Sequence, residues 1–116
     1  GGGVAQAHKM GIPVGIITGE NTEIVRRRAE KLKVDYLYQG VSDKLAVARR
    51  LCEELGIMIT DIAYIGDDLA DIPLLEACGW SGVPEGAYIK DKFTADYVTT
   101  HRGGDGAFRE FVESIL

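Results

Sequence analysis

Short apolar runs alternate with helical segments along this chain of 116 residues, and the alternation limits the folds that the chain can adopt. The runs contain little polar alternation, which is typical of strands covered on both faces in a parallel sheet. The order of the segments predicts an α/β fold with a doubly wound parallel sheet and helices on both faces. We expect the last two runs to form short edge strands. The runs lie at residues 14–17, 36–38, 62–65, 80–83 and 97–98.

Helices are predicted between the strands from apolar residues at helical spacing and from capping residues. Ser42 or Asp43 can cap one helix at its N-terminus, and Gly56 suits its C-terminal end. We expect helices that contain residues 4–10, 25–32, 48–55, 72–78 and 108–115.

The composition disfavours several classes of protein. Hydrophobic residues make up 46% and charged residues 27%, which is ordinary for one globular domain and unlike a disordered chain. The formal net charge of -5 disfavours nucleic acid and anionic membrane surfaces as partners. No apolar run approaches the roughly 20 residues of a membrane helix. Cys52 and Cys78 lack a CxxC spacing, so we expect buried free thiols in a cytoplasmic protein.

The segment after the first strand offers a candidate phosphate-binding turn. In open α/β sheets, ligands bind at the carboxyl ends of the strands. Thr18 contributes a hydroxyl there, and Gly19 lets the backbone approach a ligand closely. The following helix presents unpaired N–H groups to an anion. An ordinary strand-to-helix turn accounts for the same residues.

An acidic loop follows the third strand. Asp67, Asp68 and Asp71 place three carboxylates within five residues. Like charges so close together repel one another unless a cation lies among them. Oxygen ligands of this kind suit Mg²⁺, which keeps several waters and also binds substrate phosphate. A helix cap would explain one of these aspartates but not all three.

Lys44 is predicted at the start of the helix between these two loops. A lysine there is unfavourable beside the helix dipole, and a bound phosphate would compensate for it. A solvated surface lysine is the alternative. Taken together, the Thr18 hydroxyl, the Lys44 ammonium and the acidic loop indicate phosphoryl chemistry, because Mg²⁺ and Lys44 would neutralise phosphate oxygens.

These motifs resemble a known family. Residues 16–20, Lys44 and residues 66–71 resemble the second, third and fourth motifs of the haloacid dehalogenase superfamily of phosphatases. Residues 26–32, 38–44 and 102–110 are similar to its capless branch, which acts on 3-deoxy-octulosonate 8-phosphate and on nine-carbon sugar acid 9-phosphates. The same type of domain is fused to acylneuraminate cytidylyltransferases. The resemblance covers nearly the whole chain and implies a Rossmann-like fold.

The resemblance also implies roles for the predicted site residues. Thr18 would bind the transferring phosphate, and Lys44 would stabilise its charge. Asp67 would ligate Mg²⁺, with Asp71 and Asp68 supporting the metal site or Lys44. The substrate would be an eight- or nine-carbon sugar acid phosphate, as in lipopolysaccharide or sialic acid biosynthesis.

Charged residues near the threonine turn are candidates for contacts with a sugar acid. Glu20 follows the turn, while Arg28 and Lys31 are three residues apart on the next helix. Arg102 precedes two glycines and resembles a family segment that reaches an active site, often that of a neighbouring subunit. These residues and Gly19 form the predicted substrate-binding set. The alternative for Arg28 and Lys31 is a solvated helix face, and the alternative for Arg102 and the two glycines is a plain turn before a helix.

The family nucleophile does not occur in the sequence given. In the family, one aspartate of a DxD motif at the end of the first strand forms an aspartyl-phosphate, and the other is the general acid and base. No DxD precedes Val4, and the chain begins with three glycines instead of methionine. We therefore expect residues 1–116 to be one N-terminally incomplete domain without its first, central strand, inactive and marginally stable alone. With the N-terminal part, the resemblance implies a homotetramer.

Two other classes of protein stay open. A non-catalytic oligomerisation domain associated with an acylneuraminate cytidylyltransferase fits the missing nucleophile, but Thr18, Lys44 and the acidic loop oppose it. A phosphoacceptor receiver domain has similar length and acidity, but its acidic pair precedes its threonine and lysine. The order is reversed here, so a phosphatase is the main prediction.

Overall fold

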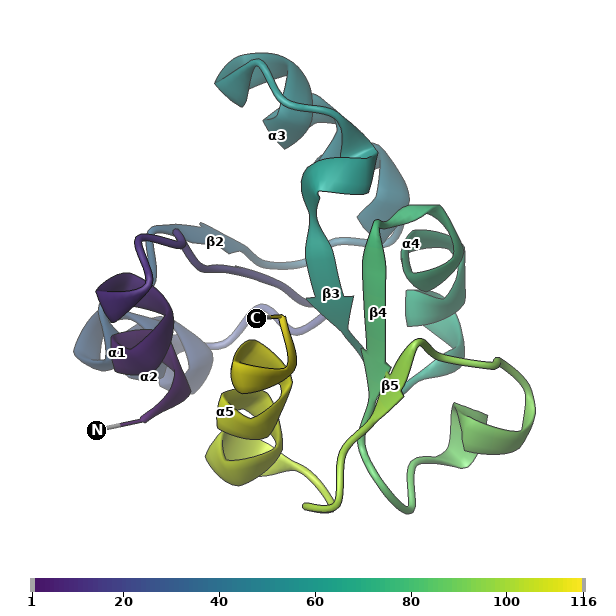
Figure 1. Cartoon of the computed structure of the whole chain (residues 1–116). Coiled ribbons are helices and arrows are strands. Elements are labelled where there is room, and N and C mark those ends of the chain that lie inside the picture. The colour runs from purple at the N-terminus through teal and green to yellow at the C-terminus, as the bar shows by residue number, and fades with distance from the viewer. Residues whose placement is uncertain (1, 116) are drawn as a thin grey trace.

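The described residues 2–115 form two separate parallel sheets, and the computed structural model shows a gap between them (Figure 1). One sheet pairs β1 with β2, and the other has the order β3-β4-β5. All strand pairs are parallel. The strands are β1 (Gly15–Ile17), β2 (Tyr36–Tyr38), β3 (Ala63–Ile65), β4 (Trp80–Val83) and β5 (Tyr97–Val98).

The helices lie where the apolar spacing predicts them, and three short 3₁₀ helices were not predicted. Figure 1 shows α1, α2 and β2 on one side of the gap, the three-stranded sheet and α4 on the other, and α5 between them. The α-helices are α1 (Gly3–Lys9), α2 (Glu23–Leu32), α3 (Lys44–Leu55), α4 (Ile72–Ala77) and α5 (Gly104–Ser114). The 3₁₀ helices are η1 (Ile59–Asp61), η2 (Leu69–Asp71) and η3 (Tyr88–Asp91).

Local capping explains where α2 and α3 begin and end. The hydroxyl of Thr22 accepts a hydrogen bond from the Val25 N–H, and the carboxylate of Asp43 accepts one from the Ala46 N–H. These contacts satisfy N–H groups that have no partner inside the helix. Gly56 closes α3 in the left-handed conformation, with a φ of 69°, as the sequence predicts.

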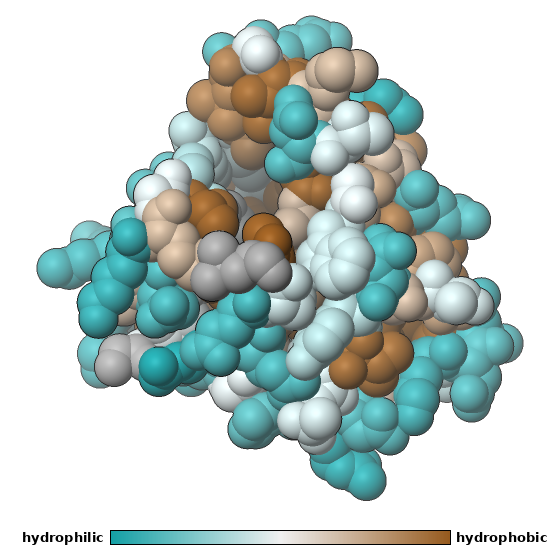
Figure 2. Space-filling model, in the orientation of Figure 1, coloured by the Kyte–Doolittle hydropathy of each residue, from teal (hydrophilic) through white to brown (hydrophobic). Residues whose placement is uncertain are grey.

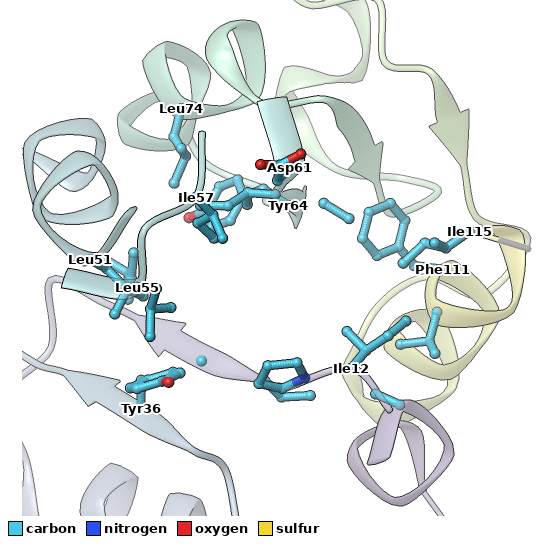
Figure 3. Close-up of a pocket in the computed structure, with 18 of the residues that line it drawn as sticks. Ile12, Tyr36, Leu51, Leu55, Ile57, Asp61, Tyr64, Leu74, Phe111 and Ile115 are labelled. Carbon is cyan, nitrogen blue, oxygen red and sulfur yellow. The ribbon is translucent and has the colours of Figure 1, made fainter. Parts of the chain in front are cut away.

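The hydrophobic core is divided in the same way as the sheet. One cluster of buried side chains joins α1 and α5 to the start of β1 and contains Val4, Ala7, Val14 and Val112. The other lies beside the three-stranded sheet and contains Leu75, Val83 and Ile89. Between the two sheets lies an apolar cavity of about 320 Å³ (Figure 3).

The structure confirms the predicted fold class and corrects one detail of it. The strands are parallel and helices cover them, as predicted for an α/β fold without its central strand. However, β4 was expected at an edge and instead lies between β3 and β5, where Ser81, Gly82 and Val83 are buried. The run of apolar and small residues in β4 therefore reflects a central position and not a short edge.

Two further expectations can be compared with the described residues. Both cysteines are free, but only Cys52 is buried, since Cys78 is partly exposed. None of the helices described combines the length and apolar character that crossing a bilayer requires.

The turn between α4 and β4 has no room for a side chain. A Cβ at Gly79 would collide with the backbone carbonyl of Thr60, which a rotamer change cannot relieve. We predict that Gly79→Ala lowers the free energy of unfolding by about 1–3 kcal/mol, measured by urea unfolding. Gly19→Ala is the control, because its Cβ would lie 3.5 Å from the carbonyl oxygen of Val41, an ordinary contact. Equal stability of the two variants would contradict the close packing at Gly79.

Candidate active site

A polar pocket of about 300 Å³ lies where β1 and β3 end. Thr18 is the first residue after β1, and Asp67 is the second residue after β3. Lys44 is the first residue of α3, and Asp71 is the last residue of η2. All four line the pocket. The structure thus brings together both predicted catalytic residues and two of the three predicted metal-site residues. Parallel strands explain this convergence, because their carboxyl ends lie at the same edge of a sheet.

Hydrogen bonds fix the threonine turn against the loop that leads to Lys44. The Val41 N–H donates to the carbonyl oxygen of Thr18 at 3.0 Å, and the Gly40 N–H donates to that of Glu20 at 2.9 Å. The Thr18 Oγ1 accepts a hydrogen bond from the Glu20 N–H at 3.1 Å. Because a hydroxyl can also donate, Thr18 keeps its proton available for an anion in the pocket.

Lys44 is held by a buried ion pair. Its Nζ lies 2.7 Å from Oδ1 of Asp71, and their side chains are 13% and 3% exposed. The ammonium group carries three protons, of which this contact uses one. Lys44 is therefore fixed in the pocket and still able to donate to a second acceptor.

Asp71 is the most saturated acceptor in the site. Its Oδ1 also accepts a hydrogen bond from the Tyr64 hydroxyl at 2.5 Å. Its Oδ2 accepts from the backbone N–H groups of Asp67 and Asp68 at 3.0 and 3.1 Å. Burial by itself would raise the pKa of the Asp71 carboxyl, but the hydrogen bonds from Lys44 and Tyr64 hold it below its usual value. Asp71 is thus positioned to orient Lys44 and the acidic loop.

The other two aspartates have different surroundings. Oδ1 of Asp68 accepts a hydrogen bond from the Leu69 N–H at 2.7 Å, and Asp68 does not line the pocket. Asp67 lines the pocket, is exposed, and its carboxylate forms no hydrogen bond or ion pair with the described residues. Within residues 2–115, no group of three or more His, Cys, Asp or Glu side chains is arranged to hold a metal ion. Mg²⁺ needs only one or two carboxylates when a phosphate and waters complete its shell. Among the described residues that line the pocket, Asp67 therefore has the carboxylate that could hold such a cation.

Tyr64 is a site residue that sequence reasoning missed. Burial and the hydrogen bond to Asp71 raise the pKa of its hydroxyl, so Tyr64 stays protonated and donates to Asp71. A tyrosine inside an otherwise apolar strand was the available signal, because a buried tyrosine hydroxyl usually has a hydrogen-bond partner.

Glu110 of α5 anchors the segment that leads to Gly103 and Gly104 at the pocket. Its carboxylate accepts hydrogen bonds from the hydroxyls of Tyr97 and Thr100 and from backbone N–H groups of Thr100 and His101. Hydrogen bonds from Tyr97 and His101 hold the pKa of the Glu110 carboxyl well below its usual range.

The predicted substrate-binding residues lie outside the lining of the polar pocket. Gly19 and Glu20 follow Thr18 directly, while Arg28 and Lys31 are exposed on α2. Arg102 packs over Gly86 and adjoins the lining residue Gly103. Their contacts with a substrate stay predictions.

Comparison with known proteins identifies the class to which this fold and site belong. A family model of haloacid dehalogenase-like hydrolases matches residues 3–79. The chain therefore belongs to the haloacid dehalogenase-like hydrolase family, as the three motifs indicated.

The similar proteins belong to the capless branch named from the sequence. The 3-deoxy-D-manno-octulosonate 8-phosphate phosphatase KdsC of Escherichia coli K12 is 40% identical over 116 residues, all of this chain, which spans 62% of that relative. The crystal structure of the Yersinia pestis phosphatase has a TM-score of 0.90 and 38% identity, covering 99% of this chain and 62% of that one. The Moraxella catarrhalis phosphatase, solved with magnesium, phosphate and KDO, has a TM-score of 0.90 and 38% identity, covering 98% and 66%.

The buried Lys44–Asp71 pair generates a prediction about pH. We predict that Asp71→Asn lowers the free energy of unfolding by about 3 kcal/mol at pH 7, because it leaves Lys44 buried without a counter-charge. The pKa of Asp71 is lowered in the folded protein, so its stabilising effect is present above about pH 4 and is lost as the pH falls through the folded pKa. The difference between the variant and the wild type should therefore shrink below about pH 4.

Urea unfolding at a series of pH values measures this difference. Asp68→Asn is the matched control, since Asn retains the cap on Leu69 and Asp68 is exposed. A difference for Asp71→Asn that does not change with pH would contradict the role of the ionised carboxylate.

Proposed function

We propose that this chain is part of a Mg²⁺-dependent phosphatase that hydrolyses the phosphate monoester of an eight- or nine-carbon sugar acid. The observation that carries the proposal is the convergence of Thr18, Lys44 and Asp67 on one pocket. Each supplies a different function that phosphoryl transfer requires: a hydroxyl donor, a cation and an oxygen ligand for a metal.

Thr18 and Lys44 would bind the phosphoryl group. The hydroxyl of Thr18 donates to one phosphate oxygen, and the ammonium of Lys44 donates to another while Asp71 holds it in place. The N-terminus of α5 also lines the pocket and has no side-chain cap. Its unpaired N–H groups favour an anion there.

Asp67 would hold Mg²⁺ when the metal is bound. A phosphate beside the exposed carboxylate of Asp67 would otherwise bring like charges together. When bound, the metal would supply positive charge that offsets both groups and the charge of the transferring phosphoryl group. The magnesium in the Moraxella catarrhalis phosphatase and the cobalt in that of Haemophilus influenzae, which is 34% identical with a TM-score of 0.88, support a metal in the proposed reaction. Asp68 would act as a loop cap and Asp71 as the partner of Lys44.

The nucleophile would come from a segment other than residues 2–115. Asp67 and Asp71 are the carboxylates that line the pocket within that range, and the first is assigned to the metal while the second is saturated by hydrogen bonds. An aspartate from a further strand would accept the phosphoryl group, which water would then release. The similarity to KdsC, of which this chain spans 62%, supports such a further segment.

The substrate assignment rests on the names of the relatives and on the charged residues near the site. The relatives are named for an eight-carbon sugar acid phosphate. Glu20, Arg28, Lys31 and Arg102 would contact the sugar body from outside the polar pocket, and Gly19 would give the substrate room. The proposal includes a nine-carbon sugar acid phosphate as the alternative substrate. It also includes a homotetramer as the oligomeric state of the protein with its N-terminal part.

The metal assignment predicts a difference between two neighbouring aspartates. We predict that the chain binds inorganic phosphate more tightly with Mg²⁺ present, and that Asp67→Asn removes this enhancement because it removes the metal ligand. Isothermal titration calorimetry with phosphate, with and without Mg²⁺, measures the effect. Asp68→Asn is the control and should keep the enhancement. Loss of the Mg²⁺ enhancement in both variants, or in neither, would contradict the role of Asp67. The absence of any phosphate binding would favour the non-catalytic oligomerisation domain.

Activity provides the second test. In the protein that includes the nucleophile segment, Asp67→Ala should lower Mg²⁺-dependent phosphate release from 3-deoxy-octulosonate 8-phosphate by about 100-fold or more. Residues 1–116 alone should release none above a mock-purified control. Full activity of the variant would overturn the metal assignment, and turnover by residues 1–116 would show that they contain a nucleophile.

A further inference from the structure

Tyr64 lies where the polar pocket and the apolar cavity meet, and it lines both spaces. Figure 2 shows a hollow in this face of the molecule with hydrophobic residues along its rim, and Figure 3 shows Tyr64 among the side chains around the cavity. The ring of Tyr64 packs against the buried cluster of Leu75, Val83 and Ile89. The hydroxyl is therefore the polar end of a side chain whose ring is held by apolar packing.

The Tyr64 hydroxyl shares one oxygen atom of Asp71 with Lys44. The hydroxyl oxygen lies 2.5 Å from Oδ1 of Asp71, and the Nζ of Lys44 lies 2.7 Å from the same atom. A carboxylate oxygen accepts hydrogen bonds along its two lone-pair directions. Because Tyr64 occupies one of these directions, Lys44 is restricted to the other.

The rest of the Asp71 side chain is equally restricted. Its Oδ2 accepts hydrogen bonds from the backbone N–H groups of Asp67 and Asp68, so the lone-pair directions of this oxygen are also filled. The side chain packs closely over Gly66, where a Cβ would lie 2.5 Å from the Cβ of Asp71. The carboxylate therefore cannot rotate toward Lys44 or accept a second of its protons while the Tyr64 hydroxyl is in place.

Tyr64 itself has no proton to give to a ligand. A hydroxyl carries one proton, and Asp71 accepts it. Burial and this hydrogen bond raise the pKa of the Tyr64 hydroxyl, so the proton stays on Tyr64. The lone pairs of the hydroxyl oxygen would repel the oxygens of a phosphate. Tyr64 therefore influences an anion in the pocket through Asp71 and Lys44.

We infer that Tyr64 is a positioning residue that directs the ammonium group of Lys44 toward an anion in the polar pocket. Its hydroxyl limits Asp71 to a single contact with Lys44, so two of the three ammonium protons stay available to the anion. The hydroxyl also withdraws negative charge from Oδ1, so Asp71 offsets less of the positive charge of Lys44. This inference rests on the proposed function, because the anion is the phosphoryl group that Thr18 and Lys44 would bind.

The variant Tyr64→Phe tests the inference, because it removes the hydroxyl and keeps the ring that packs in the core. We expect this variant to bind inorganic phosphate about fivefold more weakly than the wild type, measured by isothermal titration calorimetry. Tyr97→Phe is the matched control, since the Tyr97 hydroxyl also donates to a carboxylate, that of Glu110 at 2.6 Å, but Tyr97 does not line the pocket. Its phosphate affinity should stay within about twofold of the wild-type value. Equal affinities of Tyr64→Phe and Tyr97→Phe would overturn the inference.

A second background separates positioning from packing. Lys44→Met removes the ammonium group through which Tyr64 is inferred to act. In that background, Tyr64→Phe should change the phosphate affinity by less than about twofold, because coupled residues do not have additive effects. The same loss of affinity in both backgrounds would mean that Tyr64 acts on the shape of the pocket and not through Lys44, which would overturn the inference.

Nuclear magnetic resonance of the lysine ammonium groups observes Lys44 itself, and it applies even if Lys44→Met fails to fold or to bind phosphate. The Nζ signal of Lys44 should be visible in the wild type, because a buried ion pair slows proton exchange with water, and it should shift when phosphate is added. In Tyr64→Phe the signal should broaden and should shift less with phosphate, while Tyr97→Phe should keep the wild-type signal. A wild-type Lys44 signal in Tyr64→Phe, with and without phosphate, would overturn the inference.

Two outcomes separate this inference from the proposed function. If Asp67→Asn removes the Mg²⁺ enhancement of phosphate binding but Tyr64→Phe binds phosphate as the wild type does, the proposed function stands and the inference is overturned. If the Lys44 signal depends on the Tyr64 hydroxyl in a chain that binds no phosphate, the result supports the positioning of Lys44 by Tyr64 and contradicts the proposed function.

Discussion

The buried carboxylate of Asp71 is the contact on which the site depends. It accepts hydrogen bonds from Lys44 of α3, from Tyr64 of β3 and from the backbone of the acidic loop. A buried carboxylate without these partners would be strongly unfavourable, so the helix, the strand and the loop are held in one arrangement. That arrangement fixes Lys44 beside the pocket and leaves the neighbouring Asp67 exposed to a ligand.

The divided sheet explains how the polar pocket can be well packed although an open cavity lies next to it. Each half has its own cluster of buried side chains, so each sheet is packed without the other. The contacts between α1 and α5 and between α3 and α4 complete the layers around the gap. The polar pocket adjoins that gap, because Ile17, Tyr64 and Phe108 line both spaces.

Much of the fold follows from local sequence patterns. Strands β2, β4 and β5 have the predicted bounds, and Asp43 and Gly56 begin and end α3 as their types predict. The three 3₁₀ helices were missed because segments of three or four residues carry no periodicity. The place of β4 in the middle of a sheet was missed because strand order depends on contacts between distant residues.

The sequence by itself determined the residue types of the site and their order along parallel strands: a threonine turn, a lysine at a helix start and an acidic loop. This order suffices because parallel strands align their carboxyl ends. Only the tertiary structure decided the surroundings of the three aspartates, since Asp71 faces inward to Lys44 and Tyr64, Asp68 caps a turn and Asp67 lines the pocket. Side-chain direction and burial depend on what packs against each residue, and adjacent residues in the sequence do not reveal it.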